Sequence, residues 1–139
     1  MKYEYKYFGY TPELREVIRP VIPVTVKYEN VSIEYEALID SGADGCVFSQ
    51  DIADLMGINL KRAKKVIFQG ATGTQKFALE YPLEISIAGK SITINVLFSS
   101  NMRHAKYGIL GQQGFFENFD VKFSYFKKEI TIIPTKKKV

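Results

Sequence analysis

The stretch EALIDSGADGCVFSQD, residues 36–51, places an aspartate directly after an apolar run and follows it with small residues and glycines. The alternating apolar residues before Asp40 predict a β-strand, and Ser41 and Gly42 predict a tight turn at its end. A carboxylate at the end of a buried strand is costly unless it is hydrogen-bonded or shares a proton. The placement of Asp40 therefore indicates a chemical function.

Length and composition favour one folded domain. The chain has 139 residues, of which 46% are hydrophobic and 24% charged, a balance typical of a packed globular protein. The net charge is +4, but three lysines, Lys136 to Lys138, stand together near the C-terminus. Without them 16 basic residues face 15 acidic ones. We therefore expect no broad surface for nucleic acids and interpret the lysines as a solvated tail.

The sequence favours a cytoplasmic protein with no membrane partner. It contains no run of about 20 apolar residues, and its first ten residues, MKYEYKYFGY, lack the apolar core of an export signal. The single cysteine, Cys46, cannot form a disulfide within the chain. This fits a reducing compartment.

Alternation of apolar and polar residues predicts a mainly β fold built of hairpins. Short turn sequences separate the alternating runs, and Gly and Asn are frequent in them. The predicted turns are Glu29–Asn30, Gly70–Thr74, Ala88–Lys90 and Lys127–Lys128. The middle of the chain is therefore expected to be a meander of strands.

Helical signals are few, and we expect one or two short helices. Residues 49–57 combine Ser49 as an N-cap with Gly57 at the C-terminal end. A second helix could follow Gly111, although Gly114 weakens it. Residues 1–20 form an N-terminal extension, either an edge strand of alternating tyrosines or a short helix starting at Thr11, and a candidate dimer contact.

One lone carboxylate is a weak base and cannot also donate a proton, whereas two adjacent carboxylates retain one proton between them. At Leu38 to Asp44 the sequence resembles the hydrophobic-hydrophobic-Asp-Ser/Thr-Gly-Ala motif of retropepsin-like aspartic proteases. Ile109-Leu110-Gly111 resembles the second motif of that family. The glycine-rich turn Gly70–Thr74 lies between them, where the family has its flap. The resemblance covers roughly residues 21–133.

The resemblance implies a closed acid-protease barrel with one lobe per chain, over residues 21–134, followed by a basic tail at 135–139. It implies that the chain is an endopeptidase that needs no cofactor. The implied site residues fall into four groups. Asp40, Ser41 and Gly42 are catalytic, Ala43 and Asp44 bind substrate in the cleft, Gly70, Ala71, Thr72 and Gly73 bind substrate from the flap, and Ile109, Leu110 and Gly111 support the active-site turn.

More specific roles follow from the same resemblance. Asp40 would carry the reaction, and Ser41 would bond to its counterpart across the cleft. The amide of Gly42 would donate to the carboxylate of Asp40. Gly111 would let the supporting loop pack closely beneath the turn. Because the Asp-Ser-Gly sequence occurs once, the catalytic pair would come from a homodimer that binds a peptide or protein substrate.

Other residues give little support for a different kind of site. Cys46 has only His104 as a candidate base, so we interpret it as a small buried hydrophobe and His104 as an exposed loop residue. One cysteine and one histidine do not make a zinc site, and Asp40 and Asp44 lack the further ligands of a calcium loop. No metal is therefore expected. The N-terminal tyrosines favour a sheet edge or a subunit interface over stacking on nucleobases.

Three functions remain open from the sequence. The first is the homodimeric aspartic endopeptidase. The second is a dimeric peptide-binding or assembly module that keeps the fold and has little or no protease activity, because a fold does not establish a function. The third is nucleic-acid binding through the aromatic N-terminus and the lysine tail, which a salt-insensitive or absent affinity would exclude.

Overall fold

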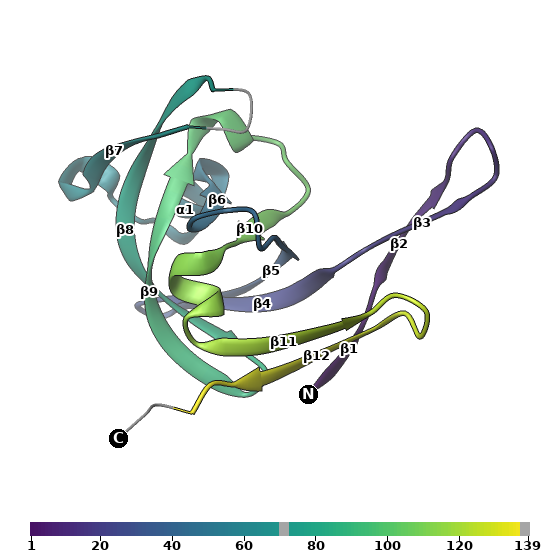
Figure 1. The fold of residues 1–139 in the computed structure, drawn as a ribbon. Coiled ribbons are helices and arrows are strands. Elements are labelled where there is room, and N and C mark those ends of the chain that lie inside the picture. The colour runs from purple at the N-terminus through teal and green to yellow at the C-terminus, as the bar shows by residue number, and fades with distance from the viewer. Residues whose placement is uncertain (70–72, 137–139) are drawn as a thin grey trace.

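Strands dominate the computed structural model, which describes residues 1–69 and 73–136 (Figure 1). They are β1 (Lys2–Glu4), β2 (Lys6–Tyr10), β3 (Glu16–Arg19), β4 (Val21–Tyr28), β5 (Val31–Ile39), β6 (Cys46–Ser49), β7 (Lys64–Gln69), β8 (Gln75–Ile87), β9 (Lys90–Ser99), β10 (Gly108–Leu110), β11 (Phe119–Ser124) and β12 (Glu129–Pro134). The helical elements are α1 (Gln50–Met56), η1 (Leu60–Arg62), η2 (Ser100–Met102) and η3 (Gln112–Phe116). The four predicted turns separate successive strands of this order.

A closed barrel forms the body of the molecule. Its strands follow the order β4-β5-β10-β6-β9-β8, and β8 pairs again with β4, so that six strands close the ring. Strand β7 extends the sheet beyond β8. Most neighbours are antiparallel, but β10 runs parallel to β5 and β6 runs parallel to β9. The predicted barrel of hairpins with one lobe per chain is confirmed.

The core fills the barrel with the inward-facing half of each alternating strand. Val24 and Val26 of β4 and Ile85 of β8 are fully buried. Two phenylalanines, Phe48 and Phe98, meet edge to face with ring centroids 6.4 Å apart. Because one face of each strand is buried, the register of each hairpin is strongly specified.

The predicted helix is present as α1, with both of its predicted ends. The Ser49 side chain accepts a hydrogen bond from the amide of Asp51, and Gly57 adopts the left-handed conformation at the C-cap. The second predicted helix is reduced to η3, in which Gln113 and Gly114 leave helical geometry. Gly114 has a φ of +96°, so the chain bends where its glycine allows it.

A three-stranded sheet joins the two ends of the described chain, in the order β1-β12-β11 (Figure 1). Tyr3 of β1 lies opposite Ile130 of β12, and its hydroxyl accepts a hydrogen bond from the amide of Ala88. Strand β12, the EITII segment, therefore has a neighbour on each side. Within this sheet of described residues, the outer strands β1 and β11 leave edges for a further strand.

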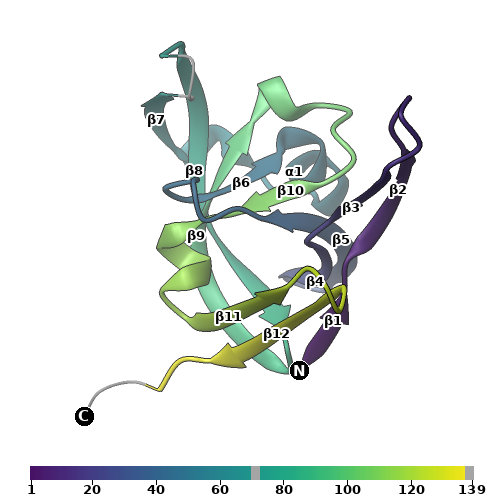
Figure 2. The same ribbon diagram turned by 45° about the vertical axis from the view of Figure 1, so that its right-hand side comes forward.

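Strands β2 and β3 form an arm that projects away from the barrel (Figures 1 and 2). The strand interpretation of residues 1–20 is confirmed, and the alternative helix at Thr11 is wrong. Thr11 instead closes a tight turn, in which its amide donates to the carbonyl of Arg15 and its hydroxyl accepts from the amide of Arg15. Leu14, in the same turn, has a φ of +60° and is 81% exposed.

Side chains hold the base of the arm against the barrel. Lys6 forms an ion pair with Glu36 of β5. The ring of Phe8 meets the ring of Tyr107 edge to face at 5.9 Å, and the guanidinium of Arg19 lies 4.8 Å from the Phe8 ring. Arg19 also donates a hydrogen bond to the hydroxyl of Tyr107. The base of the arm is therefore packed, whereas its tip extends into solvent.

Candidate active site

Asp40 follows the last residue of β5, where the barrel places β10 alongside. Its backbone amide donates to the carbonyl of Leu110 at 2.9 Å, and its carbonyl accepts from the amide of Ala43 at 3.2 Å. Its side-chain Oδ1 accepts from the amide of Gly42 at 2.9 Å. The predicted hydrogen bond from Gly42 to the carboxylate is therefore confirmed. Among the described residues, one backbone amide, that of Gly42, holds the half-buried carboxylate of Asp40.

The loop after β10 supports the turn from below. The amide of Gln112 donates to the carbonyl of Ala43 at 2.8 Å, and the amide of Gln113 donates to the carbonyl of Asp44 at 2.8 Å. A Cβ atom on Gly111 would lie 2.2 Å from the carbonyl oxygen of Gly45, which no real contact allows. The close packing predicted for Gly111 is confirmed, because a side chain there would push the two loops apart.

A cleft of about 750 Å³ opens above Asp40. Of the residues predicted to bind substrate, Ala43 and Asp44 line it. Ile109, predicted to support the turn, also lines the cleft, whereas Leu110 is fully buried. Such an arrangement suits an extended ligand lying across the active-site turn.

The other predicted site residues have varied outcomes. Gly70, Ala71 and Thr72 lie outside the described residues, and Gly73 is exposed with a φ of +78°. Ser41 is exposed, and its carbonyl accepts a hydrogen bond from the side chain of Gln112. The bond from Ser41 to a second copy stays a prediction.

Sequence reasoning missed several residues that line the cleft. Lys76 and Ile67 come from the two strands of the β7–β8 hairpin, and Leu97 and Asn101 come from β9 and η2. Lys76 is the basic residue of the cleft lining. The two hairpin residues could have been found by pairing the strands on either side of the glycine-rich turn. Leu97 could not, because it reaches the cleft only through the closed barrel.

Cys46 behaves as the predicted small hydrophobe. It has no exposed surface, and burial raises the pKa of its thiol to about 11, although backbone amides of Gly111 and Phe115 act in the opposite direction. His104 is exposed, and its backbone amide donates to the carboxylate of Asp51. A buried neutral thiol and an exposed imidazole do not form a nucleophilic pair.

Metal and membrane sites were searched over the described residues. Residues 1–69 and 73–136 contain no group of three or more His, Cys, Asp or Glu side chains placed to hold a metal ion. Within the same ranges, no helix has both the length and the apolar character needed to cross a membrane.

Comparison with known proteins places this geometry in a family. A family model described as gag-polyprotein putative aspartyl protease matches residues 24–117. Among solved structures, EIAV protease complexed with the inhibitor HBY-793 superimposes with a TM-score of 0.52 and 22% identity, over 68% of this chain and 82% of that chain. At that identity the likeness shows the fold. A search of curated proteins finds no match. The family match and the closed barrel together show that the chain belongs to the retropepsin-like aspartic protease family.

Proposed function

We propose that two copies of this chain form an aspartic endopeptidase, in which the two Asp40 carboxylates activate a water molecule for attack on a peptide carbonyl. The observation that carries the proposal is the Asp40 carboxylate itself, fixed by the Gly42 amide at the floor of a large cleft. Its second oxygen, Oδ2, accepts no hydrogen bond from the described residues. It is therefore free to face water and a second carboxylate.

The homodimer follows from the number of carboxylates that the chemistry needs. The cleft lining contains two acids, Asp40 and Asp44, and both belong to one loop. The backbone carbonyl of Asp44 accepts a hydrogen bond from the amide of Gln113, and this bond fixes the loop of Asp44 beside the turn. A symmetric partner would instead bring a second Asp40 across a two-fold axis, and the two like charges would then retain one shared proton.

The same pair explains each step of the reaction. The ionised carboxylate of the pair takes a proton from water, and the protonated carboxylate donates a hydrogen bond to the carbonyl oxygen of the substrate. Oxygen of the water then bonds to the carbonyl carbon. A proton passes to the leaving nitrogen as the C–N bond breaks, which returns the pair to its starting state. Activity should therefore fall at a pH high enough to remove the shared proton.

The test is peptide cleavage by wild type and by Asp40→Asn, read by mass spectrometry on a mixed peptide library. Asn keeps the size of the side chain but cannot take the proton, so cleavage should fall by at least about 1,000-fold. Asp120→Asn is the matched control, because it makes the same change at an exposed position of β11. Light scattering should give about twice the 15.8 kDa mass of one chain for all three proteins.

Three outcomes would contradict the proposal. Cleavage that survives Asp40→Asn, or that disappears in Cys46→Ser or with a chelator, would exclude the aspartic mechanism. A strict monomer at high concentration would exclude the shared pair. Absence of cleavage by every form, with peptide binding retained, would favour a dimeric peptide-binding module.

A further inference from the structure

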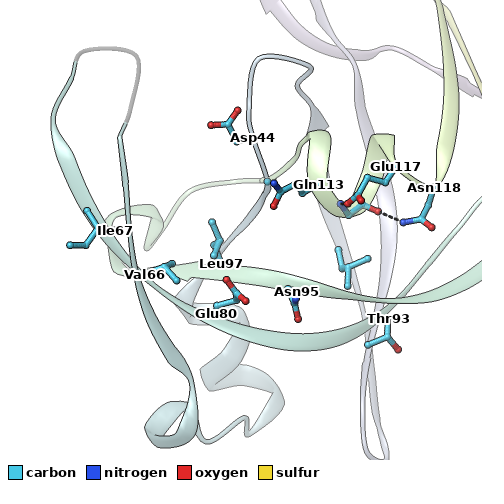
Figure 3. A pocket seen from close by; sticks show the side chains of 13 residues that line it. Asp44, Val66, Ile67, Glu80, Thr93, Asn95, Leu97, Gln113, Glu117 and Asn118 are labelled. Atoms are coloured by element: carbon cyan, nitrogen blue, oxygen red, sulfur yellow. Dashed lines mark hydrogen bonds between the residues drawn. The ribbon is translucent and has the colours of Figure 1, made fainter.

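A second cavity, of about 390 Å³ (Figure 3), shares part of its lining with the active-site cleft but is not lined by Asp40. Both cavities are lined by Asp44, Gly45, Ile67 and Leu97. These four residues therefore form the boundary between the two cavities. A peptide lying in the cleft could place one side chain past this boundary and into the second cavity.

The wall of the second cavity has apolar side chains at and next to the boundary, beside the acidic Asp44, and mainly polar side chains beyond it. Leu97 and Val66 lie close to the boundary, and Glu80 and Asn95 lie below Leu97 (Figure 3). Glu117 lines the opposite side, next to Gln113. Three carboxylates, from Asp44, Glu80 and Glu117, thus face one cavity from three separate elements.

Glu80 is the acid best placed to act on a ligand. It is half-buried, and alternation along β8 puts it on the same face as the buried Ala78. On the neighbouring strand β9 it pairs with Leu97, a boundary residue. Lys64 lies opposite it on β7. Among the described residues, Lys64 forms no ion pair with Glu80, and no other lysine or arginine does either.

Glu117 has a different set of contacts. Its Oε1 accepts a hydrogen bond from the amide of Gly114 at 2.7 Å, while the side-chain amide of Asn118 donates to the carbonyl of Gly114 at 2.8 Å. The first of these bonds holds the Glu117 carboxylate and supplies no opposite charge to pair with it. In the described part of the chain, neither Glu117 nor Asp44 takes part in an ion pair.

A long cationic side chain matches this order of surfaces. Lysine and arginine have an apolar stem that can pack along Val66 and Leu97 and a charged end that can reach Glu80. An apolar side chain of the same length would cover the carboxylates without pairing them, which is unfavourable. An acidic side chain would meet three like charges.

We propose that the second cavity is a substrate subsite that accepts a lysine or arginine side chain, with Glu80 as the main specificity-determining residue and Glu117 as the second. The inference rests on the proposed peptidase function. It adds the class of substrate: extended peptides with a basic residue at a fixed distance from the bond that is cleaved. A symmetric dimer would contain two such subsites, one on each side of that bond.

The experiment compares peptides that differ at one position, with lysine, norleucine or glutamate placed in turn at each position around the cleaved bond. Norleucine keeps the apolar stem and lacks the cation. At one position on each side of the cleaved bond, wild type should cleave the lysine peptide with a kcat/KM about ten-fold above that of the norleucine peptide, as one charge-assisted contact predicts. The glutamate peptide should be the poorest. The preference should shrink as salt is raised.

Glu80→Gln should reduce the ten-fold preference to about two-fold or less, chiefly because kcat/KM for the lysine peptide falls. Glu84→Gln is the matched control, because Glu84 lies on the same strand, is exposed and does not line the cavity. Glu80→Lys should reverse the preference in favour of glutamate. Glu117→Gln should give a smaller reduction and replaces Glu80→Gln if that variant does not fold.

Binding of the same peptides to Asp40→Asn separates the two proposals. Cleavage without a preference for lysine, or a preference that persists in both Glu80→Gln and Glu117→Gln, would overturn the subsite and leave the peptidase function intact. Preferential binding of the lysine peptide without cleavage by wild type would retain the subsite and overturn the peptidase function. Absence of both binding and cleavage would overturn both.

Discussion

The active-site turn and the β2–β3 arm both lie outside the strands of the barrel, yet they are held in different ways. Backbone hydrogen bonds from Asp40, Gln112 and Gln113 hold the turn, and there is no room for a side chain at Gly111. The arm is held at its base by surface side chains, and its tip is exposed. Rigid placement of one carboxylate requires the first arrangement, whereas the second leaves the tip free to meet another molecule.

The largest effect on stability is expected from Gly111→Ala, in the loop that supports the active-site turn. The added Cβ would collide with the carbonyl oxygens of Gly45 and Ala43, at 2.2 Å and 2.7 Å, and both are backbone atoms that cannot turn aside. We expect the free energy of unfolding to fall by about 3 kcal/mol. Chemical denaturation measures this change.

Gly45→Ala is the matched control, since its Cβ would meet only the Leu97 side chain at an ordinary 3.8 Å. That variant should stay within about 0.5 kcal/mol of wild type. Equal effects of the two substitutions would show that the supporting loop is not as tightly fixed as its hydrogen bonds indicate.

A smaller effect is expected at high pH, from Cys46 beneath the turn. Its thiol has an ordinary pKa of 9.0 and a pKa of about 11 when buried in the folded chain. The unfolded chain therefore loses this proton first, and the stabilisation, complete below pH 9, is lost as pH rises toward 11. The loss should be about 2 kcal/mol by pH 10.5.

The measurement is denaturant unfolding of wild type and Cys46→Ala at pH 8 and pH 10.5. Tyrosines and lysines titrate in both proteins. The effect of the thiol is therefore the difference between wild type and Cys46→Ala in how much the free energy of unfolding changes from pH 8 to pH 10.5. Equal changes in the two proteins would mean that the thiol is as accessible in the folded protein as in the unfolded chain.

The smallest effect on stability is expected at the base of the β2–β3 arm. Phe8→Ala removes the edge contact with Tyr107 and the cation–π contact with Arg19, and should lower stability by about 1 kcal/mol. Limited proteolysis should then cut the arm faster while the barrel resists. Tyr10→Ala removes an edge contact with Tyr7 within the arm and none with the barrel, so it should leave the stability of the barrel unchanged. A large loss of barrel stability in Phe8→Ala would show that the arm is part of the core.

Local patterns in the sequence predicted local structure well. The hairpins, the capped helix α1 and the turn at Asp40 each depend on residues close together in the chain, where turn chemistry and alternation act directly. The helix at Thr11 failed because a proline at the first position of a helix also suits a turn, and the paired strand on each side decided between them.

The remaining parts depend on contacts between distant segments. Closure of the barrel by β4 and β8, pairing of β1 with β12 and the lining of one cavity by both Glu80 and Glu117 have no periodic signal in the sequence. The motif located the candidate catalytic carboxylate, Asp40, because its chemistry is concentrated in a few consecutive residues. The residues that we propose select a substrate are contributed singly by several segments, so only the folded chain brings them together.

The pairing of β1 with β12 has a consequence for how the protein folds. The backbone of Met1 exchanges hydrogen bonds with that of Ile132, a separation of 131 residues, so this contact must wait until most of the chain is already ordered. Barrel strands joined by short turns can assemble earlier. We therefore expect the terminal sheet to be the last element to form and the first to open in hydrogen exchange, and dimers that use its free edges to assemble only after the barrel is complete.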